Sequence, residues 1–213
     1  MTALARRPHA RAGVPACLKR FAMAAQGVAA IEFAMVLPVM LAMYLGLSEM
    51  TFAVNTNRKI NGLSRTLADL TGRAPSASST EMDTIFGAGV SVMAPYKSTN
   101  AKMVISSVVV TDTGNKDPSG KPIVEGTICW STARGPSATA LAKGTKVAVP
   151  EGFATPNTSF IRADVDMIYT PILGTGILKA ITGSETLTLK EQTPWPVRNV
   201  KEVVWTGTAP CLP

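Results

Sequence analysis

The sequence predicts an α+β protein in which a long N-terminal helix, transmembrane over its first part, packs on a small antiparallel sheet domain. Three observations lead to this prediction. Residues Val28–Leu47 form an apolar stretch of 20 residues with a single charge, Glu32, which is about the length that crosses ~30 Å of hydrocarbon as a helix. Apolar residues then recur at spacings of three and four. Further on, segments rich in Val, Ile and Thr alternate with groups of Gly, Asn, Asp and Pro, as in antiparallel sheets.

The first 27 residues form a basic leader that contains no acidic residue and the one histidine of the chain, His9. The positive-inside rule places such a leader in the cytoplasm and the chain beyond about Val54 across the membrane. Its basic residues are Arg6, Arg7, Arg11, Lys19 and Arg20.

Two ordinary membrane signals also have a basic start followed by an apolar stretch: a cleaved secretory signal peptide and an uncleaved signal anchor. A cleaved secretory signal peptide has a shorter apolar core, of roughly 7 to 15 residues, and a small-x-small cleavage site, which Ser48–Thr51 does not offer. An uncleaved signal anchor is compatible with both the length and the charges, and it stays open as an alternative.

The string Gly27-Val28-Ala29-Ala30-Ile31-Glu32-Phe33-Ala34-Met35-Val36-Leu37-Pro38, followed by Leu45-Gly46-Leu47-Ser48-Glu49-Met50, resembles the TadE/TadG-like pseudopilins of tight-adherence (Flp-type) pilus systems. In type IV prepilins a dedicated prepilin peptidase cuts on the cytoplasmic face after the glycine. The resemblance therefore implies a processing site at Gly27, Val28, Glu32 and Phe33. It also implies the bacterial inner membrane, with the C-terminal domain in the periplasm. The predicted divisions are a leader at 1–27, a transmembrane helix at 28–53, its periplasmic amphipathic extension at 54–72 and a periplasmic α+β domain at 73–213.

Glu32 has a chemical reason to be in the apolar stretch if the chain is cut after Gly27. Val28 then carries a free amine, and Glu32 lies four residues away on the same helical face. Pairing with this amine, or with that of an adjacent subunit, lowers the cost of holding both charges in lipid. The alternative is a glutamate that lies at the membrane interface.

Pro38 falls inside the predicted helix. It removes a hydrogen bond to the Ala34 carbonyl, which predicts a helix kink.

The extension of the helix is amphipathic, with an apolar stripe of Ile60, Leu63, Leu67 and Leu70. The sequence predicts one nearly continuous helix from about Val28 to Thr71, stopped by Gly72 and Pro75. A second helix is expected over Glu81–Tyr96, with Ser79 or Thr80 as its cap.

Strand patterns dominate the rest of the chain, with a small helix or turn around Ile172–Ala180. The residues between the first two strands, Asp112–Pro122, are rich in Gly, Asn, Asp and Pro and predict a long hairpin loop. The expected strands are Met103–Thr111, Ile123–Ser131, Phe160–Thr170 and Glu185–Glu191.

Cys129 and Cys211 are the two cysteines that remain if the leader, with Cys17, is removed. In an oxidising compartment they are a candidate disulfide, and two free thiols are the alternative. Asp164 and Asp166 alternate on a predicted strand, so both point to one face, as a cation site or as an exposed polar face.

Catalysis, metal binding and nucleic-acid binding are not predicted. Without the leader the chain has no histidine, so Ser-His-Asp catalysis and histidine-ligated metal sites have no residue to use. Five of the 21 basic residues lie in the leader, so the net charge of the rest of the chain is close to zero.

The function expected is a minor pseudopilin or assembly component, without cofactors. Its expected partners are the prepilin peptidase, other pilins or pseudopilins, and inner-membrane pilus platform proteins. The alternatives are an uncleaved signal-anchored periplasmic binding module and an anchored hydrolase using serine and lysine.

Overall fold

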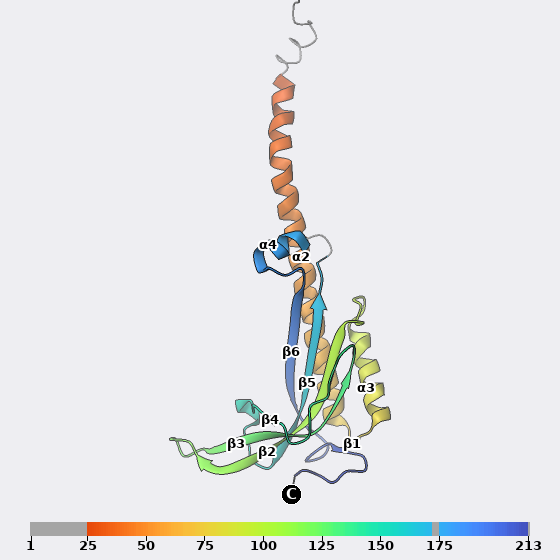
Figure 1. The fold of residues 1–213 in the computed structure, drawn as a ribbon, viewed down its shortest axis with the longest axis vertical. Coiled ribbons are helices and arrows are strands. Elements are labelled where there is room, and N and C mark those ends of the chain that lie inside the picture. Colours follow the sequence, from red (N-terminus) through yellow and green to blue (C-terminus); the bar gives the residue numbers. More distant parts are fainter. Residues whose placement is uncertain (1–24, 172–174, 213) are drawn as a thin grey trace, which may run out of the picture. The chain divides into compact units, whose positions relative to one another are not determined.

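The computed structural model describes residues 25–171 and 175–212, and the chain divides into two compact units between Ser48 and Glu49. Each unit is described by itself below. The first unit contributes the beginning of one long helix, and the second holds an antiparallel sheet and further helices (Figure 1). The predicted α+β class is therefore confirmed.

Helix α2 extends over Ala25–Arg73, three residues earlier and two residues later than the predicted helix. Pro38 lies inside it and interrupts the ladder of backbone hydrogen bonds without ending the helix. The last turn meets Pro196, since a Cβ on Gly72 would lie 2.8 Å from the Pro196 carbonyl oxygen. Only a glycine fits this close approach of helix and strand.

The stripe predicted on the second part of α2 forms the centre of the core. Ile60, Leu63 and Leu67 are completely buried, and Leu70 is half-buried. Ser64 is buried on the same side, where its hydroxyl donates a hydrogen bond of 3.0 Å to the Ala163 carbonyl. The helix therefore packs on the sheet through the face that the spacing indicated.

Among the described residues the main sheet has five antiparallel strands in the order β4-β3-β2-β5-β6. Its register places alternate residues on two faces, and each face has its own core. One face packs with α2, through residues such as Ile105 and Val165. The other face holds a smaller cluster around Phe160. The strands are β2 (Ala101–Lys116), β3 (Pro122–Arg134), β4 (Lys146–Val147), β5 (Thr158–Tyr169) and β6 (Leu187–Pro196).

The hairpin between β2 and β3 is tighter than predicted, because the strands extend through most of the expected loop. Residues 112–116 are strand, and the turn is closed by Asp117. The Asp117 carboxylate accepts hydrogen bonds from the Ser119 hydroxyl and from the Lys121 backbone N–H, and these bonds hold its pKa below the usual value. The long-loop prediction was wrong. Residues 112–116 are exposed on both faces of the sheet, so this part of the strand has the polar composition that is typical of a loop.

Helix α3 spans Ser79–Val92 and is capped by Ser78, not by either predicted residue. The Ser78 hydroxyl accepts from the Glu81 backbone N–H at 3.2 Å, as an N-cap does, and donates to the Glu81 carboxylate at 3.0 Å. The helix ends four residues before Tyr96, since the residue before Pro95 disfavours helical backbone.

Besides β4, three short elements were not predicted. Strands β1 (Ser76–Ala77) and β7 (Val204–Trp205) form a parallel pair that joins the end of α2 to the C-terminal segment. A 3-10 turn, η1 (Glu151–Phe153), places Phe153 against Phe160 with ring centroids 5.0 Å apart. Helix α4 covers Thr175–Thr182 and overlaps the small helix or turn predicted around Ile172–Ala180, of which residues 172–174 lie outside the described residues.

Asp69 joins the end of α2 to strand β6 and the residues after it. Its carboxylate lies 2.6 Å from the Arg73 guanidinium and 3.5 Å from that of Arg198, and it accepts 2.9 Å from the Trp195 indole N–H. Burial opposes its ionisation, but the hydrogen bonds from Arg73 and Trp195 outweigh burial and hold the pKa of Asp69 below its usual value.

Replacing Asp69 by asparagine should lower the free energy of unfolding at pH 7, and this loss should disappear in acid. A carboxyl group whose pKa is lower when folded stabilises above its unfolded pKa, about 3.9, and stops doing so as the pH falls through the folded value. Urea unfolding of both proteins between pH 7 and pH 2 measures the difference. Asp83→Asn is the matched control, because its carboxylate is 76% exposed and only 3.4 Å contacts join it to Arg134. A difference that persists at the lowest pH would contradict this account.

Candidate functional site

The predicted processing residues lie at the beginning of α2. Gly27 is in its first turn, and no atom lies within 4 Å of the position that a Cβ would take there. Val28 is 58% and Phe33 is 61% exposed, and Glu32 is exposed as well. Because Val28 and Glu32 are four residues apart in a continuous helix, they share one face. The predicted processing residues that follow Gly27 are therefore exposed in the described chain.

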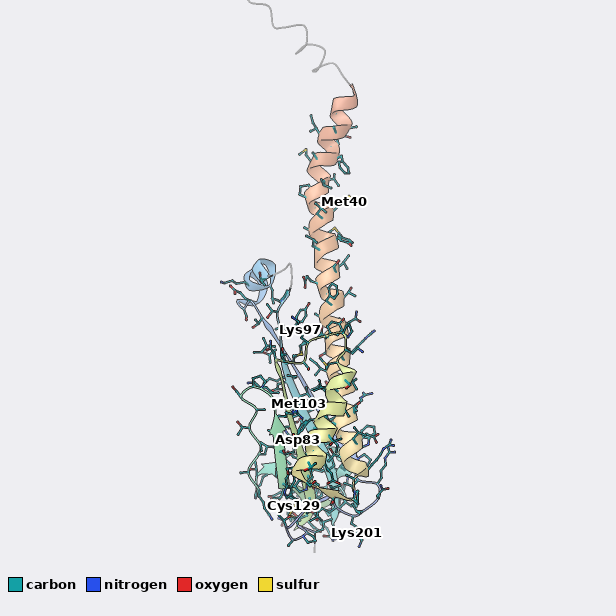
Figure 2. All side chains as sticks on the ribbon, turned by 90° about the vertical axis from the view of Figure 1, so that its right-hand side faces the viewer. Met40, Asp83, Lys97, Met103, Cys129 and Lys201 are labelled. Atoms are coloured by element: carbon teal, nitrogen blue, oxygen red, sulfur yellow. A yellow bond between two sulfur atoms is a disulfide. The ribbon has the colours of Figure 1, made fainter. Side chains whose placement is uncertain are left out.

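Side chains of the apolar stretch are exposed on every side of the helix, as Met40 illustrates in Figure 2. Every residue from Val28 to Leu47 is exposed, and α2 is the one helix among the described residues that is long and apolar enough to cross a membrane. A water-soluble helix covers one face with its own core. The stretch Val28–Leu47 has no such face, which fits a single-pass membrane anchor surrounded by lipid or by other helices.

Glu49 is the first residue of the second unit, and its side chain bonds to Tyr169, the last residue of strand β5. The Tyr169 hydroxyl donates a hydrogen bond of 3.1 Å to the Glu49 carboxylate. Burial and this carboxylate raise the pKa of Tyr169 to about 12, so the phenol stays a neutral donor at any physiological pH. Sequence reasoning missed Tyr169, since 120 residues separate the two partners and no local pattern connects them.

Cys129 and Cys211 are joined by a disulfide in the structure, with their Cα atoms 6.0 Å apart. Cys129 is the extra residue of a β-bulge, because Trp130 pairs with Ser107 while Ile128 pairs with Val108. The bulge lets both Cys129 and Trp130 contribute to the core that contains α2. The C-terminal tail is thereby fixed to the sheet.

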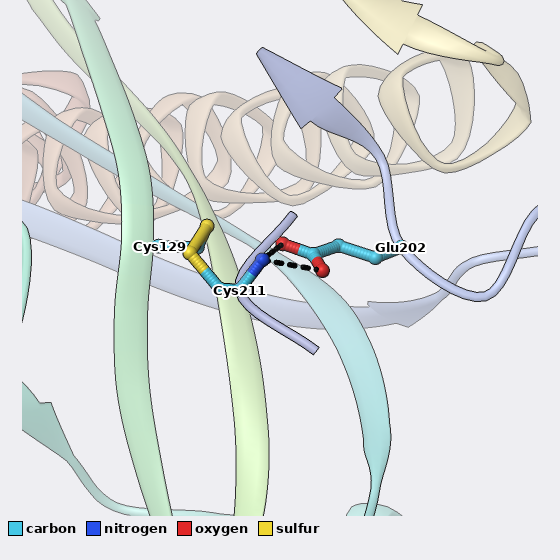
Figure 3. A group of neighbouring side chains, drawn as sticks. All are labelled: Cys129, Glu202 and Cys211. Carbon is cyan, nitrogen blue, oxygen red and sulfur yellow. Dashed lines mark hydrogen bonds between the residues drawn. A yellow bond between two sulfur atoms is a disulfide. The ribbon is translucent and has the colours of Figure 1, made fainter. Parts of the chain in front are cut away.

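Glu202 adds a second attachment for the same tail. Its side chain is buried, and its carboxylate accepts hydrogen bonds of 3.0 and 3.2 Å from the backbone N–H of Cys211 (Figure 3). It also accepts a hydrogen bond of 2.8 Å from the backbone N–H of Leu212. The Trp130 indole N–H also donates 2.6 Å to the Val203 carbonyl. Sequence reasoning did not identify Glu202, because a single glutamate among Lys, Val and Trp gives no local signal.

Cys129, Glu202 and Cys211 bring three potential metal-binding atoms within 4.8 Å of one another. Metals bind the thiolate form of cysteine, and here both sulfurs are used in the disulfide. The Glu202 oxygens already accept backbone N–H groups. In the oxidised protein the arrangement therefore anchors the tail and offers no metal site.

The aspartates that alternate on β5 already have cationic neighbours. The Arg162 guanidinium lies 2.9 Å from the Asp164 carboxylate. Asp166 pairs in register with Lys102 on one side and with Lys190 on the other. Both aspartates are half-exposed on the sheet face opposite α2, so the arrangement is that of a solvated charged face.

Comparison with known proteins gives one match, which falls on α2. Residues 27–69 match the model of a family described as TadE-like protein. The match begins at the predicted processing glycine and extends through the buried stripe of the second unit. No curated protein and no solved structure matches the chain.

Proposed function

We propose that this chain acts as a minor pseudopilin or assembly component of a tight-adherence (Flp-type) pilus. The proposal is supported by the match of residues 27–69 to the family described as TadE-like protein. The observation that carries the proposal is the coincidence of this match with the exposed apolar stretch of α2, Val28–Leu47, which follows Gly27 and contains one carboxylate, Glu32. Such a helix is suited to contacts in the membrane rather than to catalysis. A sheet domain that follows it distinguishes the chain from pilins that are little more than one helix.

The maturation step that fits this role is cleavage after Gly27 by a prepilin peptidase in the bacterial inner membrane. The basic leader favours a cytoplasmic N-terminus and a periplasmic second unit. Cleavage gives Val28 a positive amine, and the negative Glu32 on the same face can bind that amine or the amine of a neighbouring subunit. Opening one frayed turn at the start of α2 exposes the peptide bond, since the first turn has no hydrogen bonds from its N–H groups within the helix.

The first test is the N-terminal sequence of the protein extracted from membranes with and without the cognate prepilin peptidase. We expect a chain beginning at Val28 only when the peptidase is present. Gly27→Leu should keep the leader attached, because a bulky side chain replaces the small residue before the cut. A leader retained in every sample would instead indicate the uncleaved signal-anchored binding module.

A second prediction separates processing from assembly. Glu32→Gln should reduce pilus assembly by about tenfold or more, since a lost charge-assisted hydrogen bond is worth roughly 1.5 to 3 kcal/mol. Counting pili and measuring incorporation of the tagged protein gives the effect. Glu49→Gln is the matched control on the same helix, because its carboxylate bonds within the second unit, to Tyr169. Equal assembly by the wild type and the Glu32 variant would contradict the role given to this carboxylate.

A further inference from the structure

The two ends of the main sheet differ in chemistry. One end is the β2–β3 hairpin, where residues 112–121 include the charged side chains of Asp112, Lys116, Asp117 and Lys121. The other end is where β5 stops and β6 starts, with α4 between them (Figure 1). Residues 168–187 carry two charges, Lys179 and Glu185, and these neutralise each other in an ion pair of 2.6 Å.

Large apolar side chains are exposed at this second end on both faces of the sheet. Ile168 is 44% and Leu187 is 39% exposed. Leu187 pairs with Tyr169 and so lies on the face that contains α2, whereas Ile168 lies on the opposite face. A protein partner that packs on one face would leave the other residue in water. A surrounding apolar or interfacial medium covers both.

The position of Glu49 along α2 fixes this end of the sheet near the membrane. Glu49 follows the apolar stretch by two residues, which is about 3 Å along a helix. The Tyr169 hydroxyl bonds to its carboxylate, and Ile168 and Leu187 are at the same end of the β5–β6 ladder. Tyr169 is half-buried with its hydroxyl hydrogen-bonded, and tyrosine is enriched at the membrane–water interface.

We infer that the end of the β5–β6 ladder, through Ile168 and Leu187, is a membrane contact that rests in the headgroup region of the bilayer. The occupant of this apolar surface is lipid. Interfacial segments of this kind lie about 5 to 10 Å into the boundary between headgroups and acyl chains. The contact restrains the second unit at the bilayer surface, so that its charged hairpin end is the end available to other proteins. The inference requires only the membrane anchor and does not depend on cleavage or on a pilus.

The test measures lipid contact directly in the full-length protein in nanodiscs. In a Cys17→Ser background, with Cys129 and Cys211 bonded, Ile168→Cys and Leu187→Cys each provide one free thiol for a fluorescent label. Ile123→Cys is the matched control, because Ile123 is also 44% exposed but lies at the hairpin end. Nitroxide-bearing lipids quench labels in the interface, and iodide quenches labels in water.

Labels at 168 and 187 should be quenched by the lipid nitroxides and protected from iodide, while the label at 123 should show the reverse. Iodide quenching at 168 and 187 equal to that at 123 would overturn the inference. Protection from both quenchers would overturn it as well, because it would mean that protein covers the surface. Thermal unfolding of each labelled variant confirms that the fold is intact.

Discussion

Replacing both Cys129 and Cys211 by serine should lower the free energy of unfolding by about 4 kcal/mol. The two residues are 82 apart in sequence, and closing a loop of that size removes that much conformational freedom from the unfolded chain. Domains of this kind have a total stability of roughly 5 to 15 kcal/mol, so the loss is a large share of it. The double variant is preferable to a single one, because it leaves neither disulfide partner as an unpaired thiol.

The measurement is urea unfolding of the wild type, the double variant and Cys17→Ser, each with and without reductant. The double variant should unfold at lower urea and should no longer respond to reductant, whereas Cys17→Ser should behave as the wild type does. Hydrogen exchange should locate the first loss of protection at Val204–Trp205 and at the Leu212 amide, because these depend on the tail. A double variant as stable as the wild type would show that Glu202 and the Trp130–Val203 bond hold the tail without the disulfide.

Elements with a strong local pattern could be predicted from the sequence. The stripe of Ile60, Leu63 and Leu67 gave both the helix and its buried face, because helical spacing repeats within a few residues. Strand β5 could be predicted within two residues at its start and one at its end, since its alternating apolar residues are buried on one face. In these cases the local pattern and the tertiary environment agree.

Strands that lie in solvent were predicted poorly. The outer part of β2, residues 111–116, is exposed on both faces and has the polar composition of a loop. Strand β6 was predicted to end at Glu191 and continues to Pro196, although it contains Pro194. Proline is tolerated there because β6 is an edge strand, and an edge position is set by the whole sheet rather than by local sequence.

The candidate site shows the same division. Cys129 and Cys211 could be paired from the sequence because cysteines are few. Gly27 and Glu32 fall within a short motif, and their part in processing stays a prediction. Glu202 and Tyr169 could not, since their roles come from partners that the fold brings together. A buried glutamate is expensive unless it is paired, so its position becomes understandable only once the N–H groups of the tail are seen around it.

Leu67→Ala should lower the free energy of unfolding by roughly 2 to 5 kcal/mol, and adding Gly89→Ala should return part of that loss. Leu67 is completely buried, and truncating it leaves a cavity at the contact between α2 and α3. A Cβ on Gly89 would lie 2.6 Å from Leu67 Cδ2 and 2.9 Å from Leu63 Cδ1, so alanine alone is too large for the intact core. Without the Leu67 side chain, that methyl group occupies vacated space.

A double-mutant cycle measures this coupling between the two helices. We expect the double variant to be more stable than the sum of the single effects by about 1 kcal/mol or more, because the two positions share one volume. Gly87→Ala is the control on the same helix, since no atom lies within 4 Å of its Cβ position. That substitution should stabilise α3 by about 0.5 to 1 kcal/mol and add independently to Leu67→Ala. Additive effects of Leu67→Ala and Gly89→Ala would mean that the helices separate slightly to admit the methyl group, and that glycine at 89 is not required for their close packing.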